Sequence, residues 1–236
     1  HIGGIDDKLH RQHLICGGMS RYDIEDALID LDLLGIDNIL ALRGDAARGE
    51  QRFTASSQGW EHADQLVRQI TDMNRGHFLD DETQHDYRTH FCVGVAGYPE
   101  KHAEAANMET DIANLRRKVD AGASYIVTQL CFDNAKIFSF IDSCRKAGIT
   151  VPIIPGIKPL STAKHLTILP QTFHVDIPQP LVQEVSRCKT SEQIRQAGIE
   201  WAIMQARELK AAGLPVIHFY TMGKADGVAE IVKAVF

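Results

Sequence analysis

Charged and hydrogen-bonding side chains recur in this sequence at the ends of short apolar runs. The run "NILAL" is followed by Arg43, Gly44 and Asp45, and the run "PIIPGI" is followed by Lys158. The carboxyl ends of parallel strands are where ligands bind in α/β folds. Polar groups at so many strand ends suit an extended polar ligand better than a two-residue acid–base pair. The set also includes His13, Tyr98, Glu100, His102, Thr128, Gln129, Thr221 and Lys224.

Several catalytic and nucleotide-binding signatures are absent from the sequence. The eleven histidines form no H-E-x-x-H or H-x-H spacing, and no Ser-His-Asp order is present, so no metal site is predicted. The segment "GVAG" at 94–97 does not extend to G-x-G-x-x-G, and there is no Walker A sequence. A nucleotide-binding open sheet therefore lacks its usual signature.

Each polar residue at a strand end also has an ordinary structural interpretation. Asp45 could cap the next helix, and Arg43 could be a solvated charge at the rim of the sheet. His13 could be a core histidine with satisfied hydrogen bonds, and His102 could be a surface residue. Gln129 lies inside an apolar run, where an amide needs a partner, and this favours a functional role. Placement of the whole set at one edge is the stronger observation.

The elements that carry these residues follow one repeated pattern of helix, glycine and apolar run. Gly35, Gly122, Gly148 and Gly213 stand where a helix C-terminus needs a left-handed residue. The runs after them are nearly continuous, as in parallel strands covered on both faces. Six strands are predicted, at residues 13–16, 38–43, 91–97, 125–131, 152–156 and 216–221.

Helix signals lie between these strands. Ser20 with Asp23 resembles a capping box, and the apolar face that follows runs from Ile24 to Leu34. Asn107 and Asp133 are predicted N-caps of two further helices. This αβ alternation predicts right-handed βαβ units on a parallel sheet. Six strands allow an open doubly wound sheet, whereas a (β/α)8 TIM barrel needs two more.

Composition narrows the class of protein. The chain has 236 residues, 44% of them hydrophobic, and a net charge of 25 − 31 = −6 with no basic block, so we expect neither nucleic acid nor membrane as a partner. No apolar run approaches the about 18 residues that span a bilayer. We expect a cytoplasmic protein with reduced thiols. Its five cysteines, odd in number and widely spaced, are Cys16, Cys92, Cys131, Cys144 and Cys188.

Six collinear segments together resemble methylenetetrahydrofolate reductase of the bacterial type. They are "HLICGG", "DNILALRGD", "VAGYPEKHAEA", "DIANLRRKVDAGASYIVTQLCFD", "PIIPGIKPL" and "IHFYTMGKADG", in order over almost all of residues 13–236. The resemblance implies a (β/α)8 barrel with FAD at the carboxyl ends of its strands. It also implies reduction of 5,10-methylenetetrahydrofolate to 5-methyltetrahydrofolate by NADH or NADPH, in one-carbon and methionine metabolism. We further expect a homo-oligomer.

The resemblance assigns roles to individual positions. Asp45 would stand near the pterin and tune the flavin electrostatically, which makes it the candidate catalytic residue. Gln129 would hydrogen-bond the folate ring, and Lys224 would meet the folate glutamate tail. The positions that match flavin contacts are His13, Leu42, Arg43, Gly44, Asp45, Ala96, Tyr98, His102, Asp111 and Lys118.

Three departures from the family pattern qualify this assignment. Position 224 is Lys where the bacterial pattern has Arg, so a point charge replaces a bidentate fork. Position 62 is His where a Tyr is usual near the flavin. No Glu-Phe-Phe-Pro-Pro-like strand, which carries the family's catalytic glutamate, precedes the first predicted strand.

The absence of the Glu-Phe-Phe-Pro-Pro-like strand and the count of six strands lead to the same expectation for the domain. Residues 1–236 form a single barrel domain that lacks its first two βα units, about 60 residues. Residues 74–90 form an inserted polar loop. We therefore expect the chain alone to be poorly stable and to reduce little folate. The alternatives are a flavin- and folate-binding barrel without catalytic activity, and a phosphate-sugar barrel enzyme unrelated to folate.

Overall fold

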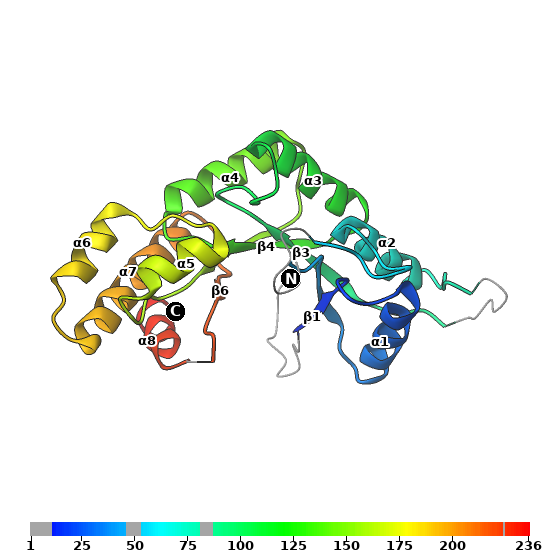
Figure 1. The fold of residues 1–236 in the computed structure, drawn as a ribbon, viewed down its shortest axis with the longest axis horizontal. Coiled ribbons are helices and arrows are strands. Elements are labelled where there is room, and N and C mark those ends of the chain that lie inside the picture. The colour runs from blue at the N-terminus through cyan, green and yellow to red at the C-terminus, as the bar shows by residue number, and fades with distance from the viewer. Residues whose placement is uncertain (1–10, 46–52, 81–86, 224) are drawn as a thin grey trace. The chain divides into compact units, whose positions relative to one another are not determined.

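The structure, a computed structural model, describes residues 11–45, 53–80, 87–223 and 225–236. A helix follows each described strand along the chain, and three helices lie in succession between the last two strands (Figure 1). All six predicted strands are present, with ends that differ from the predicted ones by up to two residues. They are β1 (Arg11–Ile15), β2 (Asn38–Leu42), β3 (Cys92–Gly97), β4 (Tyr125–Leu130), β5 (Ile153–Ile157) and β6 (His218–Phe219).

The described helices are α1 (Arg21–Leu33), α2 (Ala63–Met73), α3 (Met108–Asp120), α4 (Asn134–Lys146), α5 (His165–Phe173), α6 (Gln179–Arg187), α7 (Ser191–Ala211) and α8 (Asp226–Val235). The predicted caps are confirmed. The N–H of Asp23 donates to Ser20 Oγ (3.2 Å), that of Thr110 to Asn107 Oδ1 (2.9 Å) and that of Ala135 to Asp133 Oδ1 (2.9 Å). These side chains satisfy N–H groups that have no acceptor inside the helix.

The glycines predicted to end helices do so in the left-handed region. The φ angles of Gly35, Gly122, Gly148 and Gly213 are 72°, 119°, 77° and 84°. Each glycine lets the chain leave a helix and turn into the next strand without the steric cost of a Cβ. The same short connection is thus used four times.

The strands form a sheet whose order is β1-β2-β3-β4-β5-β6. The pairings with described register, β1 with β2, β2 with β3 and β5 with β6, are parallel; for example, Leu14 pairs with Ala41 and Leu40 with Gly94. A doubly wound nucleotide-binding sheet reverses direction after its first strands and has the order 3-2-1-4-5-6. A strictly sequential order excludes that alternative.

The described residues group into two compact units. The first runs to Ala96 and includes Asn114–Ile126, and the second comprises Gly97–Ala113 and Val127–Phe236. In the first unit, Ile24, Ile39 and Ile70 lie in the core. In the second, apolar clusters lie on α7 and beneath α5 and α6. The expectation of a single domain stays a prediction.

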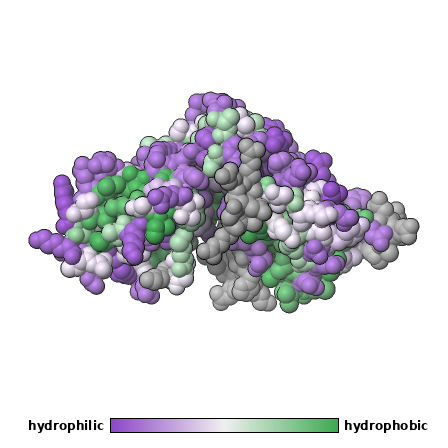
Figure 2. Space-filling view, viewed as in Figure 1, coloured by the Kyte–Doolittle hydropathy of each residue, from purple (hydrophilic) through white to green (hydrophobic). Residues whose placement is uncertain are grey.

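One helix face differs from its prediction. Ile24 and Leu28 of α1 are buried, but Leu34, predicted on the same face, is 75% exposed and its neighbour Leu33 is 73% exposed. Leu34 is the C-cap of α1 and lies beyond the last buried turn. Figure 2 shows apolar surface over this helix.

The polar segment before β3 has no regular structure where it is described. Residues 74–80 and 87–90 contain neither helix nor strand, and residues 81–86 lie outside the described part. The Asn74 side chain joins the two ends of this segment, because Asn74 Nδ2 donates to Phe91 O (2.9 Å) and Asn74 Oδ1 accepts from the Phe91 N–H (2.9 Å). Within the described ranges, no helix combines the length and hydropathy needed to cross a bilayer.

Candidate functional site

The end of β2 presents the Arg43-Gly44-Asp45 segment in the first unit. Ladder-type hydrogen bonds continue past the strand, since the N–H of Cys16 donates to Leu42 O (3.0 Å) and that of Gly17 to Arg43 O (3.0 Å). Gly44 then has a φ of 92°, and a Cβ there would lie 2.5 Å from Ile15 Cγ2. Both the turn and the close approach therefore require glycine.

The two charges beside Gly44 have different surroundings. The Arg43 guanidinium lies 4.8 Å from the centroid of the Phe53 ring, a cation–π contact, and Arg43 Nε donates to Gly44 O (3.3 Å). Asp45 is exposed. The next described helix, α2, has His62 as its N-cap, so Asp45 caps no helix in the described part. Its carboxylate is accessible to a ligand.

Three further predicted residues of the first unit are His13, Ala96 and Lys118. His13 on β1 is exposed, so the alternative of a core histidine is wrong. Lys118 Nζ on α3 donates to Ala96 O at 2.8 Å, which ties the helix to the end of β3. Asp111 and Lys118 are two turns apart on the same helix, as predicted from their spacing.

In the second unit, three predicted residues form one connected group after β3. The rings of Tyr98 and His102 pack edge to face with centroids 4.7 Å apart. The N–H of His102 donates to Asp111 Oδ2 (2.9 Å), and Asp111 is only 8% exposed. His102 Nδ1 accepts from the Glu104 N–H (3.1 Å), which places the proton of the neutral ring on Nε2.

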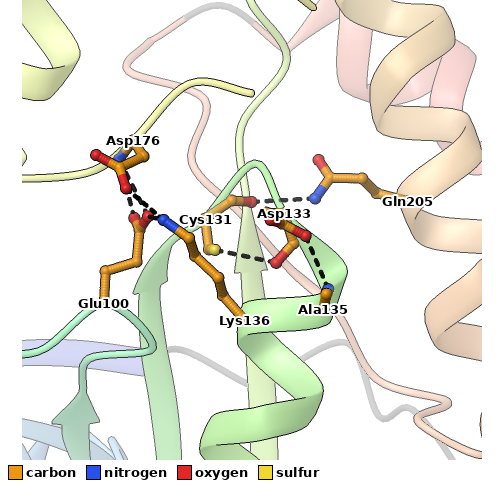
Figure 3. Close-up of polar contacts among 7 residues, drawn as sticks. All are labelled: Glu100, Cys131, Asp133, Ala135, Lys136, Asp176 and Gln205. Atoms are coloured by element: carbon orange, nitrogen blue, oxygen red, sulfur yellow. Dashed lines mark hydrogen bonds and ion pairs between the residues drawn. The ribbon is translucent and has the colours of Figure 1, made fainter. Parts of the chain in front are cut away.

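Glu100, from the same segment, is held by an ion pair. Its side chain is 9% exposed and accepts from Lys136 Nζ, which also contacts Asp176, so the lysine points between two carboxylates (Figure 3). The Asp176 N–H donates to both Glu100 oxygens at 3.1 Å. Burial raises the pKa of Glu100, although the contacts with Lys136 and the Asp176 N–H oppose it. Burial alone would lower the pKa of Lys136, but its bonds to Asp176 and Glu100 outweigh burial and raise it.

The amide of Gln129 on β4 is half-buried. Its Oε1 accepts from the Leu130 N–H at 3.0 Å, which satisfies the acceptor and leaves the two amide N–H donors for another partner. Thr128 beside it has a structural role, because its Oγ1 accepts from the Gly156 N–H (2.8 Å).

Lys158 and Tyr220, at the ends of β5 and β6, are buried and half-buried respectively, with hydrogen bonds that the sequence did not predict. Tyr220 Oη donates to Thr128 O at 2.8 Å, and burial, followed by the nearby Tyr98 phenol, raises the pKa of Tyr220. Lys158 is 5% exposed and its Nζ donates to Tyr220 O at 3.3 Å. The sequence places Lys158 after a strand, but its burial depends on residues far along the chain.

The structure thus distributes the predicted residues over both units. His13, Leu42, Arg43, Gly44, Asp45, Ala96 and Lys118 belong to the first unit, and Tyr98, His102, Asp111 and Gln129 to the second. Lys224 lies outside the described residues. No cluster of three or more His, Cys, Asp or Glu side chains suited to a metal ion occurs in the described ranges.

Comparison with known proteins gives one consistent family. The model of the family described as methylenetetrahydrofolate reductase matches residues 9–235. The chain is 35% identical to methylenetetrahydrofolate reductase 1 of Schizosaccharomyces pombe over 94% of this chain and 34% of that protein. It is 32% identical to 5,10-methylenetetrahydrofolate reductase of Escherichia coli over 95% of this chain and 70% of that protein. The chain therefore spans about a third of the fission-yeast relative's length.

One solved structure shares the fold. It is an uncharacterized protein from Clostridium thermocellum that binds two copies of 5-methyl-5,6,7,8-tetrahydrofolic acid. The TM-score is 0.58 at 17% identity, covering 94% of this chain and 70% of that one. At this identity the likeness shows a common fold.

Proposed function

The chain belongs to the methylenetetrahydrofolate reductase family, and we propose that it takes part in the reduction of 5,10-methylenetetrahydrofolate to 5-methyltetrahydrofolate with NADH or NADPH. The match of the family model over residues 9–235 carries this proposal. We also propose that the six strands belong to a (β/α)8 barrel. Their sequential order, with a helix after each strand, supports this arrangement.

FAD is the proposed cofactor, and each unit by itself offers groups that suit part of it. Tyr98 offers an aromatic ring, His102 and Asp111 offer hydrogen-bonding groups, and Lys118 offers a cation for a phosphate. Gly44 leaves the backbone without a Cβ at the turn after β2. When bound there, FAD supplies the hydride chemistry, and the protein supplies binding, orientation and charge.

The residues around Arg43 would adjust the charge at the flavin. The exposed carboxylate of Asp45 stands one glycine away from the Arg43 guanidinium, which the Phe53 ring holds in place. In the second unit, Asp111 fixes the backbone at His102, and the Tyr98 ring packs against the His102 ring. This rigid support orients groups before the ligand arrives.

Folate would be bound by Gln129 and Lys224. The N–H donors of Gln129 have no other described acceptor and can meet a pterin oxygen or nitrogen. The fold neighbour from Clostridium thermocellum binds a reduced folate, which supports a folate ligand for this fold. Lys224 would attract the glutamate carboxylates by charge alone.

Flavin binding and reduction test this proposal. The purified protein is titrated with FAD and followed by flavin absorbance, and NADH or NADPH is then added without oxygen. We expect a bound flavin that one of the two nucleotides bleaches. Protein that binds no flavin would overturn FAD as the proposed cofactor. Flavin that bleaches but is not re-oxidised by methylenetetrahydrofolate would favour the binding barrel without catalytic activity.

A further inference from the structure

Lys158 is a buried cation at the end of β5. The strand ends at Ile157, and the side chain of the next residue, Lys158, is 95% buried, since only 5% is exposed. Burial lowers the pKa of its amine. A buried ammonium is unfavourable unless hydrogen bonds and an opposite charge compensate it.

The described contacts compensate this charge only in part. An ammonium group has three N–H donors, and one of them reaches Tyr220 O at a long 3.3 Å. No carboxylate in the described ranges lies within ion-pair distance of Lys158. Lys136, in the same unit, contacts both Glu100 and Asp176. Of these two lysines, Lys136 has carboxylate partners, whereas Lys158 has none among the described residues.

The surroundings of Lys158 connect it to the predicted ligand residues of the second unit. The Tyr220 N–H donates to Ile157 O (3.0 Å), and Tyr220 Oη reaches Thr128 O (2.8 Å). A Cβ at Gly156 would lie 2.6 Å from the Tyr220 ring, so the ring covers the end of β5. The Tyr98 phenol is close enough to raise the pKa of Tyr220. Lys158, after β5, and Tyr98, after β3, both belong to the second unit.

We propose that Lys158 is a ligand-binding residue whose ammonium binds an anionic oxygen of the bound ligand. The inference rests on the proposed function, which supplies two sources of such an oxygen, a phosphate of FAD and a carboxylate of the folate. A hydrogen bond to a charged group in a buried site contributes more than one between neutral groups. The family resemblance assigns no role to this position.

The competing explanation is structural, with Lys158 serving only to hold the Tyr220 carbonyl. Stability of the ligand-free protein separates the two. Lys158→Met keeps a side chain of similar length and removes the buried charge. Replacing buried charges by apolar side chains often leaves the stability of the folded protein unchanged or raises it. We expect the melting temperature of Lys158→Met to equal or exceed that of the wild type. A clear fall would mean that the lysine holds the fold and would overturn the proposal.

Binding of paired ligands identifies the anion. Dissociation constants are measured for FAD against riboflavin, which lacks phosphate, and for 5-methyltetrahydrofolate against its analogue without glutamate. We expect Lys158→Met to weaken one charged ligand about tenfold or more and its uncharged counterpart little. Lys158→Arg should keep most of the affinity, and Lys164→Met, at an exposed lysine, should change nothing.

Equal loss for charged and uncharged ligands, or no loss at all, would overturn the role of Lys158. These results differ from a failure of the proposed function. If the wild-type protein binds neither flavin nor folate, the proposed function fails and the inference fails with it. If the wild type binds them and Lys158→Met binds them equally well, only the inference fails.

Discussion

The two compact units hold their predicted ligand residues in different ways. In the first, Asp45 and His13 are exposed, and Arg43 rests on the Phe53 ring. In the second, Asp111 is buried and hydrogen-bonded, and Lys158 is buried close to Tyr220. Exposed polar residues contribute little to stability, whereas buried ones must be compensated by neighbouring groups. The difference implies that substitutions of the exposed residues in the first unit affect function more than folding, whereas substitutions that remove a partner from a buried carboxylate or N–H group in the second unit affect folding as well.

The largest expected loss of stability follows Lys136→Met in the second unit. It leaves the Glu100 carboxylate, 9% exposed, with the Asp176 N–H but without its cation. Removing one partner of a largely buried pair should lower the free energy of unfolding by about 2–3 kcal/mol, measured by urea denaturation. Lys146→Met, which breaks the exposed pair with Asp142, is the control and should change it by less than about 0.5 kcal/mol. Equal effects of the two changes would contradict the contrast between buried and exposed charges.

A smaller loss is expected for Asp111→Ala. The change removes the acceptor of the His102 N–H inside a buried site, at a cost of about 1.5 kcal/mol. We also expect weaker FAD binding, because the backbone that carries His102 is no longer fixed. Asp111→Asn keeps an acceptor oxygen and should recover most of the stability. If Asp111→Ala unfolds at the wild-type urea concentration, the buried bond does not stabilise this segment.

The pH dependence of Lys136→Met sharpens the same contrast. The pKa of Glu100 is raised by burial, so the folded protein binds this proton more tightly than the unfolded chain does. Its contribution to the free energy of unfolding therefore falls as the pH rises from the ordinary value of 4.5 through the raised pKa. Lys136 lowers the pKa of Glu100, so its loss should raise that pKa further in the folded protein. The stability gap to the wild type should narrow as the pH falls towards 4.5, and Glu100→Gln in the Lys136→Met background should abolish this trend.

The smallest effect on stability is expected for Asp45→Asn in the first unit. The carboxylate is exposed and caps no described helix, so the free energy of unfolding should change by less than about 0.5 kcal/mol. Methylenetetrahydrofolate reduction should nevertheless fall about tenfold or more, because a charge near the flavin is lost. An unchanged rate would refute the catalytic role, and a large loss of stability would refute the contrast between the units.

The sequence predicted secondary structure correctly where the signal lies within a few consecutive residues. Strands came from continuous apolar runs and caps from single polar residues, so β2 and the start of α1 were predicted well. Helices α5 and α6 were missed, and α5 contains Pro170, a residue that disrupts helix patterns. Helix α2 was also missed, although its buried Leu66, Val67, Ile70 and Met73 follow helical spacing.

Contacts between residues far apart in the sequence could not be predicted from local sequence patterns. The Glu100–Lys136 ion pair joins residues 36 apart, and the bond from Lys158 joins residues 62 apart. A lysine after an apolar strand is ordinarily a solvated charge, and only the folded structure shows that Lys158 is buried. Roles at Arg43, Asp45 and Gln129 came from the family resemblance, because spacing alone left their structural alternatives open.

Product formation by the reduced protein tests the central proposal most directly. Protein loaded with FAD is reduced by NADH or NADPH without oxygen, mixed with 5,10-methylenetetrahydrofolate, and the folates are separated by chromatography. We predict slow formation of 5-methyltetrahydrofolate by this chain alone, in proportion to the flavin re-oxidised, and still less of it with Asp45→Asn. Flavin that stays reduced, or re-oxidation without 5-methyltetrahydrofolate, would contradict the proposal that these strand ends carry out folate reduction.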